Sequence, residues 1–387
     1  MRIVYFFRFE SHFSGVEKKV NSQIHHLRAN GTDCIAYYIY SDDPSKDHND
    51  YVRILEMPHF NHKADILNKL RVELFFINIL EEQISSLKDQ DILFMRIPYP
   101  SYFLSRLLSR PRTCKIVIEY QSIEPLEYRS EGKYWYLLID SLFGDAIRKY
   151  SDAIVGVTDE ITQYELYRSG TINKPHITIG NGCNVDSIPL REPPHFSSNN
   201  LNLLCVTSVD SRHGLDRLIR GLALYRGPTT VTLHIAGEGP ELPNLKSIVR
   251  ELEILDMVKF HGYMTGKPLE SLFDTCHLAV GSLGMHRQGL TQGSILKSRE
   301  YIARGIPYVI ACADPDVPDD FPYTHRVLPD ESPVSIEAVI DFAQIISGDP
   351  EHPQKMRAYA MEHLDWSVKM NRLKKFFEIL IDDNSNR

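Results

Sequence analysis

Residues 285–307 read MHRQGLTQGSILKSREYIARGIP, and the fold can be inferred outward from this stretch. It opens with a polar loop that contains Gly289 and Gly293. Ser294 is then expected to cap a helix, because a serine oxygen can accept from the free N–H groups of a first helical turn. Gly305 is expected to end that helix, and a proline two residues later prevents its return. The apolar run that follows is typical of a short buried strand.

A helix that begins after a glycine loop directs free N–H groups and the positive end of its dipole into that loop, which suits an anion. Lys297 and Glu300 lie three residues apart, on one face of the predicted helix. A cation and a carboxylate would therefore emerge beside the anion, and a phosphate next to a ribose would use both. The alternative is an ordinary loop, helix and strand with a surface ion pair between these two residues.

Length and composition favour a chain of two globular domains, with 387 residues, 43% hydrophobic residues and 24% charged residues. The net charge of -8 argues against a nucleic-acid partner, which needs a basic face. No apolar run approaches the length of about eighteen residues expected of a membrane-spanning helix. The first residues, MRIVYFF, resemble a strand and are too short for the core of a signal peptide.

Six cysteines are present, and none of them forms a CxxC pair. Several lie in apolar runs that resemble strands. We therefore expect buried free thiols in a reducing cytoplasm, with no zinc site and no disulfide framework.

Strands and helices alternate through the first half of the chain, which predicts a parallel sheet. A capping-box pair, Ser14 and Glu17, begins a helix directly after the first strand. Since ligands bind at the carboxyl ends of parallel strands, Phe13 to Gly15 are expected at a binding edge. The expected strands are 1–7, 33–39, 91–96, 115–120, 153–158 and 176–179.

Residues 187–200 are rich in proline, serine and asparagine without periodicity, and we interpret them as an interdomain linker. The domains would then be 1–186 and 201–364. The tail, 365–387, repeats apolar residues at spacings of three and four and is expected to pack back on the first domain. In the second domain we expect strands at 203–206, 231–236, 258–260 and 278–280, with a tight turn at 211–214 and a helix at 215–222.

A basic cluster in the first domain contains Arg106, Arg110, Arg112 and Lys115. One interpretation is a solvated helix end. The other is a contact with anionic lipid head groups or a lipid phosphate.

Three motifs of the second domain point to a known family. A strand ends in AGEGP at 236–240, the next strand ends in FHG at 260–262, and Glu300 precedes ARGIP at 303–307. Together with the glycine loop they resemble GT-B glycosyltransferases of the family-4, retaining type. The chain looks like a subgroup found in bacterial capsular and surface-polysaccharide clusters. The resemblance covers most of residues 201–380 and is looser in the first half.

The resemblance implies an α/β fold with two Rossmann-like, doubly wound domains that face each other across a cleft. It implies transfer of a sugar from a UDP- or GDP-sugar to a saccharide or polyprenyl-linked acceptor, without a metal or a cofactor. Retention without an obvious carboxylate nucleophile implies attack on the face of the leaving diphosphate, whose own phosphate would accept the proton. The protein is expected in the cytoplasm, with peripheral contact at the inner face of the membrane.

Residue roles follow from the same resemblance. The expected catalytic residues are Lys297, Arg212 and Gln292. The expected donor-binding residues are Glu300, Gly293, Ser294, Ile295, Leu296, Gly289, Arg287, His213, Ser208, Gly237, His261 and Gly262. The expected acceptor-side residues are Ser14, Gly15, Glu119, Gln121 and Arg96.

The sequence departs from the family pattern at its charged positions. The first glutamate of the family's pair falls at Gln292, which carries no charge. The arginine and lysine that usually oppose the diphosphate fall at Ser208 and His213, and a histidine is only partly charged near its reference pKa of about 6.5. Arg212, Lys297 and Arg287 are the available substitutes. The histidine that the family carries after a first-domain strand has no counterpart after Ile118.

Three other functions remain open at this point. A dinucleotide oxidoreductase would use the glycines at 237 and 239, but the third glycine of that motif is replaced by Leu242. A GT-B nucleotide-sugar epimerase would use the same glycine loop. A catalytically inactive homologue that binds a nucleotide sugar would explain Gln292 and the missing cations.

Overall fold

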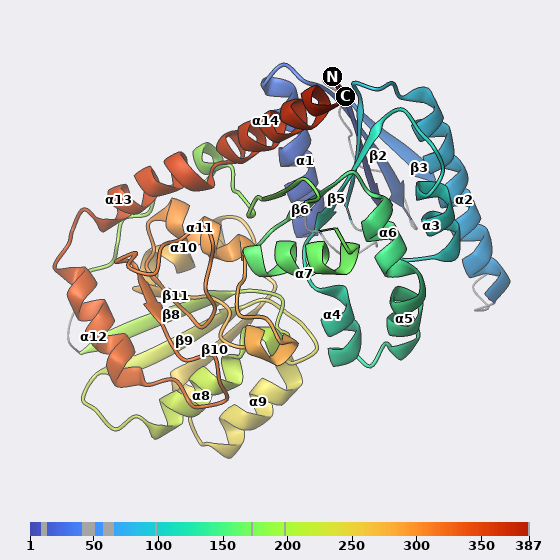
Figure 1. The fold of residues 1–387 in the computed structure, drawn as a ribbon. Coiled ribbons are helices and arrows are strands. Elements are labelled where there is room, and N and C mark those ends of the chain that lie inside the picture. Colours follow the sequence, from blue (N-terminus) through green and yellow to red (C-terminus); the bar gives the residue numbers. More distant parts are fainter. Residues whose placement is uncertain are drawn as a thin grey trace. The chain divides into compact units, whose positions relative to one another are not determined.

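The structure, a computed structural model, describes residues 1–8, 14–40, 51–56, 66–96, 99–171, 173–196 and 199–385. It consists of two compact units, one made of Met1–Gly180 with Trp366–Arg387 and the other of Asn181–Asp365. Each unit is a parallel sheet with helices, as expected for two Rossmann-like domains (Figure 1).

The sheet of the first unit has the strand order β3-β2-β1-β4-β5-β6-β7. β1 is an inner strand, and its Ile3 pairs with Cys34 on one side and Ile92 on the other. The central strands are apolar on both faces, as is typical of a parallel sheet covered by helices. The strands are β1 Arg2–Arg8, β2 Asp33–Tyr40, β3 Val52–Glu56, β4 Ile92–Arg96, β5 Lys115–Tyr120, β6 Ala153–Gly156 and β7 His176–Thr178.

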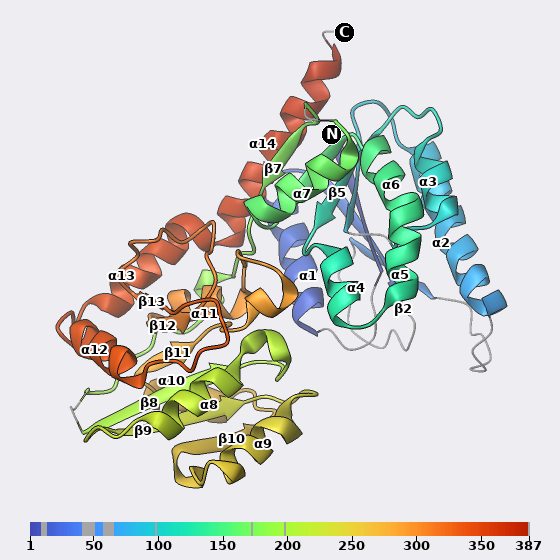
Figure 2. The ribbon, with the colours of Figure 1, turned by 60° about the horizontal axis from the view of Figure 1, so that its bottom comes forward.

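Helices of the first unit begin with α1, Ser14–Ala29, which starts where the capping-box pair predicts it. The preceding loop, including Phe13, lies outside the described residues. α5 and α6 follow each other as one rod, joined by the π-helical turn η1 (Figure 2). The remaining helical bounds are α2 Ile66–Ser86, α3 Tyr102–Leu108, α4 Glu124–Ser130, α5 Tyr134–Ile139, η1 Asp140–Gly144, α6 Asp145–Tyr150 and α7 Asp159–Ser169.

The C-terminal helix α14, Trp366–Ser385, belongs to the first unit and lies beside α1 (Figure 1). Its apolar residues at spacings of three and four lie in the same core as the residues of β1 and β4. The ring of Phe377 meets that of Phe94 edge to face, with centroids 5.4 Å apart. The apolar stripe of the tail therefore covers one face of the first sheet.

The sheet of the second unit has the strand order β10-β9-β8-β11-β12-β13. Its strands are β8 Asn200–Val206, β9 Thr230–Ala236, β10 Val258–Gly262, β11 Leu278–Val280, β12 Tyr308–Ile310 and β13 Thr324–Arg326. Its α-helices are α8 Leu215–Leu224, α9 Leu242–Glu251, α10 Lys267–Thr275, α11 Leu296–Arg304, α12 Ile336–Ser347 and α13 His352–Tyr359. Short 3-10 turns are η2 Val185–Ser187, η3 Ser211–His213, η4 Leu255–Met257 and η5 Met285–Gln288, and η6 Ala360–Leu364 is π-helical.

The segment 187–200, which we interpreted as a linker, lies within the second unit instead. Its Arg191 is buried, and the guanidinium donates to the carbonyl oxygens of Gly305 at 3.2 Å and His277 at 3.1 Å. Arg191 thus ties this part of the chain to the loops of the second unit, although its sequence has no periodic pattern. The chain passes between the units at Gly180–Asn181 and at Asp365–Trp366.

The start of α11 also differs from the expectation that Ser294 caps it. The helix begins at Leu296, after Ile295 in an extended conformation. The Ser294 Oγ accepts instead from the backbone N–H of Asn181 at 2.6 Å and from Nη2 of Arg299 at 3.0 Å. The expected stop is confirmed, since Gly305 ends α11 with a φ of +74°.

Arg299 is fully buried and forms the ionic centre of the second unit. Its Nη2 donates to Asp314 Oδ1 and to Asp316 Oδ2, both at 2.8 Å, and its Nε donates to the carbonyl of Asn181 at 2.9 Å. Burial opposes the charge, but the two carboxylates outweigh burial and raise the pKa of Arg299. One guanidinium thus joins α11, the loop before it, the segment after β12 and the start of the unit.

We expect Arg299→Met to destabilise the second unit by about 3–5 kcal/mol, because two carboxylates would stay buried without their cation. Hydrogen exchange at increasing urea, followed on peptides of the second unit, measures this loss. Arg326→Met is the matched control, since Arg326 pairs with the exposed Asp319 and its loss should cost less than about 1 kcal/mol. Equal losses in the two variants would contradict a special role for Arg299.

Candidate active site

Loops that follow the strands of the second unit meet at the carboxyl edge of its sheet. The Gly237 N–H, directly after β9, donates to the carbonyl of Gly262 at the end of β10, at 2.7 Å. The φ of Gly237 is +144°, and a Cβ there would lie 1.7 Å from the carbonyl oxygen of Thr207. Only glycine therefore lets the loops after β8 and β9 approach so closely. Gly237 and Gly262 lie at the edge where ligands of such sheets bind.

Lys297, in the first turn of α11, points to the loop after β8. Its Nζ donates to Nδ1 of His213 at 3.2 Å and lies 3.7 Å from Sγ of Cys205. Glu300 accepts instead from Nε of Arg304 at 2.9 Å. The alternative of a surface ion pair between Lys297 and Glu300 is therefore wrong, because the two side chains have different partners.

His213 is buried beside Lys297, with Nδ1 also 3.0 Å from Oγ of Ser282. Burial, with the neighbouring cations Lys297 and Arg212, lowers the pKa of His213 well below its usual value of 6.5. Because Lys297 donates to Nδ1, the ring hydrogen lies on Nε2, which is 3.6 Å from Oδ2 of Asp210. The lowered pKa indicates a neutral ring beside Lys297, so His213 adds no charge, and a cation for the diphosphate has to come from another residue, as the sequence already required.

The ammonium group of Lys297 is shielded from water by the surrounding protein. Burial lowers its pKa, and the nearby Cys205 and Asp210 oppose that effect. Within the described ranges, no carboxylate forms an ion pair with Lys297. A partly buried ammonium without a neutralising carboxylate is suited to meet an anion that arrives from solution.

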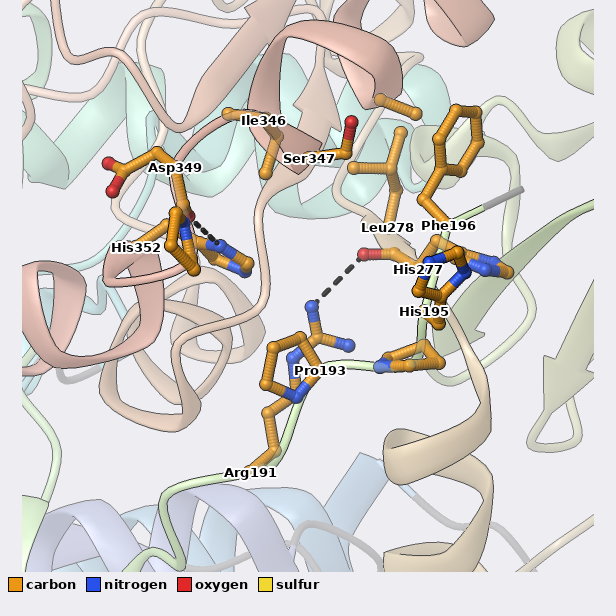
Figure 3. A pocket seen from close by; sticks show the side chains of 13 residues that line it. Arg191, Pro193, His195, Phe196, His277, Leu278, Ile346, Ser347, Asp349 and His352 are labelled. Carbon is orange, nitrogen blue, oxygen red and sulfur yellow. Dashed lines mark hydrogen bonds between the residues drawn. The ribbon is translucent and has the colours of Figure 1, made fainter. Parts of the chain in front are cut away.

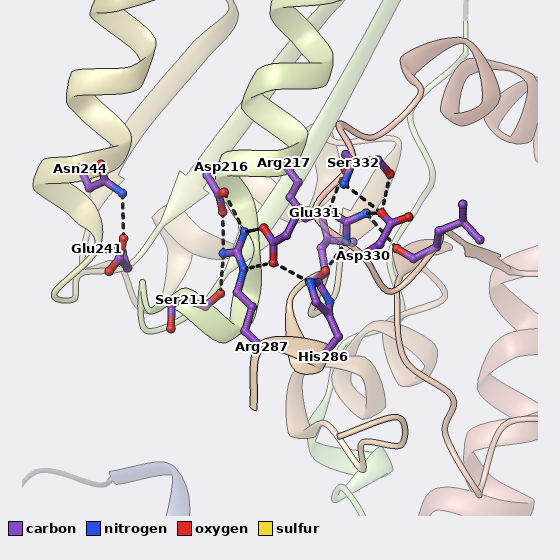
Figure 4. Close-up of polar contacts among 12 residues, drawn as sticks. Ser211, Asp216, Arg217, Glu241, Asn244, His286, Arg287, Asp330, Glu331 and Ser332 are labelled. Carbon is purple, nitrogen blue, oxygen red and sulfur yellow. Dashed lines mark hydrogen bonds and ion pairs between the residues drawn. The ribbon is translucent and has the colours of Figure 1, made fainter. Parts of the chain in front are cut away.

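Arg212 and Arg287, the other expected cations, already have carboxylate partners. Nε of Arg212 lies 3.0 Å from both carboxylate oxygens of Asp210. Arg287 donates to Asp216 at 2.8 Å and to Glu331 at 2.9 Å, in a network that Figure 4 shows. The hydrogen bonds to these carboxylates raise the pKa of Arg287. Arg287 is therefore neutralised and Arg212 shares its charge with one carboxylate, whereas Lys297 forms an ion pair with no carboxylate of the described residues.

The loop before α11 is held against the segment after β12. The Gly293 N–H donates to the carbonyl of Ala313 at 2.8 Å, and Gln292 forms a parallel bridge with Ala313. Gly289, with a φ of +71°, ends η5 at the start of this loop. Ser294, described above, is buried behind the loop, while Ile295 and Leu296 lead into the helix.

Two further expected donor-side residues have local partners. Oγ of Ser208 donates to Oδ2 of Asp210 at 3.3 Å. The ring of His261 stacks on that of His234, with a ring-nitrogen separation of 3.0 Å. Burial and the neighbouring His261 lower the pKa of His234 to about 4.

Sequence reasoning missed Asp210, Cys205 and Ser282, which surround His213 and Lys297. Asp210 had a local signal, because an aspartate before a tight turn commonly accepts from the backbone two residues on, as it does here from Arg212 at 3.2 Å. Cys205 and Ser282 had no such signal, since each follows from the packing of separate strands.

The acceptor-side residues lie in the first unit. Glu119 lies near the carboxyl end of β5, and Gln121 directly follows that strand. Arg96 ends β4 beside Glu119 in the ladder. Lys19 of α1, which sequence reasoning missed, contacts both Glu119 and Gln121. Ser14 and Gly15 begin α1.

The basic cluster of the first unit is largely paired within the protein. Arg110 forms an ion pair with Glu81, and Nη2 of Arg112 donates to Asp152 at 2.7 Å. Arg106 remains exposed on α3. No helix in the described part of the chain has the length and apolar character needed to cross a membrane.

A cavity of about 370 Å³ lies at the opposite edge of the second sheet, near the amino end of β11 (Figure 3). Its lining includes Arg191, Phe196, His277, Ile346 and His352. It is separate from the loop that precedes α11. Among the residues that the structure describes, no three potential ligand side chains gather as a metal site.

Comparisons with known proteins bear on the fold and on the family of the second unit. Residues 188–311 match the family model described as Glycosyl transferases group 1. No curated protein sequence is significantly similar to the chain.

Solved structures similar to the chain include sucrose-phosphate synthase from Thermosynechococcus elongatus, with a TM-score of 0.70, 15% identity and coverage of 99% of this chain and 100% of that chain. The lipopolysaccharide outer core galactosyltransferase WaaB has a TM-score of 0.65, 16% identity and coverage of 96% and 98%. HepE of Anabaena, in complex with UDP-glucose, has a TM-score of 0.64, 14% identity and coverage of 98% and 100%. The chain thus has the fold of GT-B glycosyltransferases, and its residues 188–311 match their group 1 family.

Proposed function

We propose that this protein transfers a sugar from a nucleotide-sugar donor to a saccharide acceptor and binds the donor in its second unit. The observation that carries the proposal is Lys297, a partly buried cation with no carboxylate partner in the described chain, at the start of a helix inside the matched segment. The similar HepE structure is a complex with UDP-glucose, which makes a UDP-sugar the first donor to test.

The proposed chemistry follows from what glycosyl transfer requires. A nucleoside diphosphate must leave, and its growing charge must be stabilised. Lys297 and the free N–H groups at the start of α11 would face that charge, with Arg212 as the second cation. His213, neutral and hydrogen-bonded to Lys297, would hold the ammonium in place. These groups supply the stabilisation without a metal.

Other residues have supporting roles in the proposal. Glu300, in the second turn of α11, would accept hydrogen bonds from the ribose hydroxyls, and Gln292 would bind a sugar hydroxyl through its amide. Attack on the face of the leaving diphosphate would retain the configuration of the sugar, with the donor phosphate accepting the proton.

The acceptor class and the location stay predictions. We propose a saccharide acceptor, in the polyprenyl-linked form used for surface polysaccharides, in the cytoplasm at the inner face of the membrane. Arg110 and Arg112 already form ion pairs within the protein. We therefore propose Arg106 as the arginine of the basic cluster that contacts the membrane. A nucleotide-sugar epimerase or an inactive homologue would share the donor site but form no glycoside.

Labelled UDP- and GDP-sugars, incubated with the protein and lipid-linked saccharides, test the function directly. We expect the label to appear in a glycoside product, with EDTA present throughout, because protein cations oppose the diphosphate charge. A free epimer as the product would establish the epimerase, and binding without turnover would establish the inactive homologue. Transfer that stops in EDTA and returns with magnesium would refute the metal-free mechanism.

Lys297→Ala is expected to lower the turnover rate by roughly a hundredfold or more, the scale of losing one group that stabilises transition-state charge. Steady-state kinetics at saturating donor measure the rate. Lys267→Ala, at an exposed position in the same unit, is the control and should leave turnover nearly unchanged. If the Lys297→Ala enzyme keeps most of its turnover, Lys297 does not stabilise the leaving diphosphate, and Arg212 becomes the candidate for that role.

Glu300→Ala is expected to weaken UDP binding about tenfold or more, because two hydrogen bonds from the ribose to a carboxylate would be lost. Calorimetry with UDP measures this affinity. Glu270→Ala is a matched control, because Glu270 pairs with the same Arg304 as Glu300 does. If both variants lose the same affinity, the effect comes from the freed Arg304 and Glu300 does not bind the ribose.

A further inference from the structure

A second group of buried charges lies in the first unit, where β4 and β5 end against α1. Its carboxylate, Glu119, is 2% exposed. Nε2 of Gln23 donates to Oε1 of Glu119 at 3.0 Å, the Tyr5 hydroxyl lies 3.1 Å from Oε2, and the ammonium of Lys19 lies 3.4 Å away. Glu119 is therefore fully satisfied by residues of its own unit.

Lys19 joins this carboxylate to the next polar residue of the cluster. It is 4% exposed, and its Nζ donates to Oε1 of Gln121 at 2.5 Å. Burial lowers the pKa of Lys19 to about 7; Glu119 opposes that shift and Arg96 adds to it. Lys19 is thus a cation whose charge is only partly supported by its surroundings.

Arg96 brings a second cation to the cluster, and no second carboxylate accompanies it among the residues that the structure describes. It pairs with Glu119 across the β4–β5 ladder, and its guanidinium carbon lies 5.2 Å from the centre of the Phe7 ring. Its Nη1 is buried and has no hydrogen-bond partner in the described part of the chain, and the same holds for the amide nitrogen Nε2 of Gln121. Two cations, Lys19 and Arg96, therefore face one carboxylate that already has its partners.

Two buried donors without partners in one cluster are unusual, because a buried donor without an acceptor costs free energy. Both donors would be satisfied by an oxygen anion, which would also balance the excess positive charge. A guanidinium presents a planar fork that matches a carboxylate or a phosphate.

We propose that Arg96 and Gln121, with Lys19 behind them, form an anion subsite that binds a phosphate or carboxylate group of the acceptor. That the anion belongs to the acceptor rests on the proposed function, whereas the binding of an anion at this place does not. The anion is either the phosphate of a lipid-linked acceptor or the carboxylate of an acidic sugar, and both present the same oxygen chemistry to Arg96.

Calorimetric titration of the full chain with methyl phosphate, and in a second arm with methyl glucuronide, tests the subsite. We expect binding that Arg96→Gln weakens at least tenfold, while Arg106→Gln, an exposed arginine of the same unit, leaves it nearly unchanged. The binding that depends on Arg96 should persist in Lys297→Ala, which lacks the donor-site cation, and this separates the subsite from the donor site. The arm that binds more tightly identifies the source of the anion.

Gln121→Glu provides a second variant whose fold is not at risk. It places a carboxylate of nearly the same shape beside Lys19 and Arg96, so it should abolish anion binding and raise the thermal unfolding midpoint. A structural cluster without a ligand would show no anion binding in the wild-type chain.

Three results would overturn the proposal: no binding of either anion to the wild type, equal binding by Arg96→Gln, or loss of binding in Lys297→Ala alone. If the protein binds an anion through Arg96 but transfers no sugar, the proposed function is wrong and the anion subsite is still supported. If the protein transfers sugar but Arg96→Gln does not change the binding of either anion, the proposed subsite is wrong and the proposed function is still supported.

Discussion

The buried contact of Arg299 with Asp314 and Asp316 is the constraint on which the second unit depends. It holds the loop before α11 through Ser294 and the start of the unit through Asn181. A charge in this place is tolerated only because two carboxylates and several oxygens surround it. The start of α11 is fixed as a result, and with it the position from which Lys297 extends.

The cations of the second unit differ in what neutralises them, and this difference decides what each can do. Arg299 and Arg287 each have two carboxylate partners, so their charge is used in holding the protein together. Lys297 has a neutral imidazole and a thiol instead. A diphosphate would therefore gain most from Lys297, because no carboxylate of the described residues forms an ion pair with it and Asp210 supports its charge only from nearby.

The first unit contains a comparable cation. In the first unit Arg96 has an aromatic ring and a carboxylate that is already satisfied, in place of an ion pair of its own. Each unit thus keeps a cation with incomplete internal compensation at the carboxyl edge of a parallel sheet. That edge is where doubly wound sheets bind ligands, so the charges lie where a substrate would meet them.

The sequence by itself determined the alternation of strands and helices, because periodicity and glycine punctuation are local properties. Strands such as β5 and β11 and the stop of α11 at Gly305 could all be predicted in this way. The second unit's motifs also indicated the GT-B fold. Regions without a clear pattern, such as β3 and α12, were not predicted.

Only the tertiary structure decided which partners the charged residues take. Nothing local to Ser294 reveals that Asn181 and Arg299 occupy its oxygen, and nothing near Arg191 shows that its segment is anchored within a unit. Lys19 lies beside the apolar stripe of α1, but its contact with Glu119 joins residues a hundred positions apart. Partners so distant in the chain are brought together by the sheet order, which is a long-range property that local spacing does not encode.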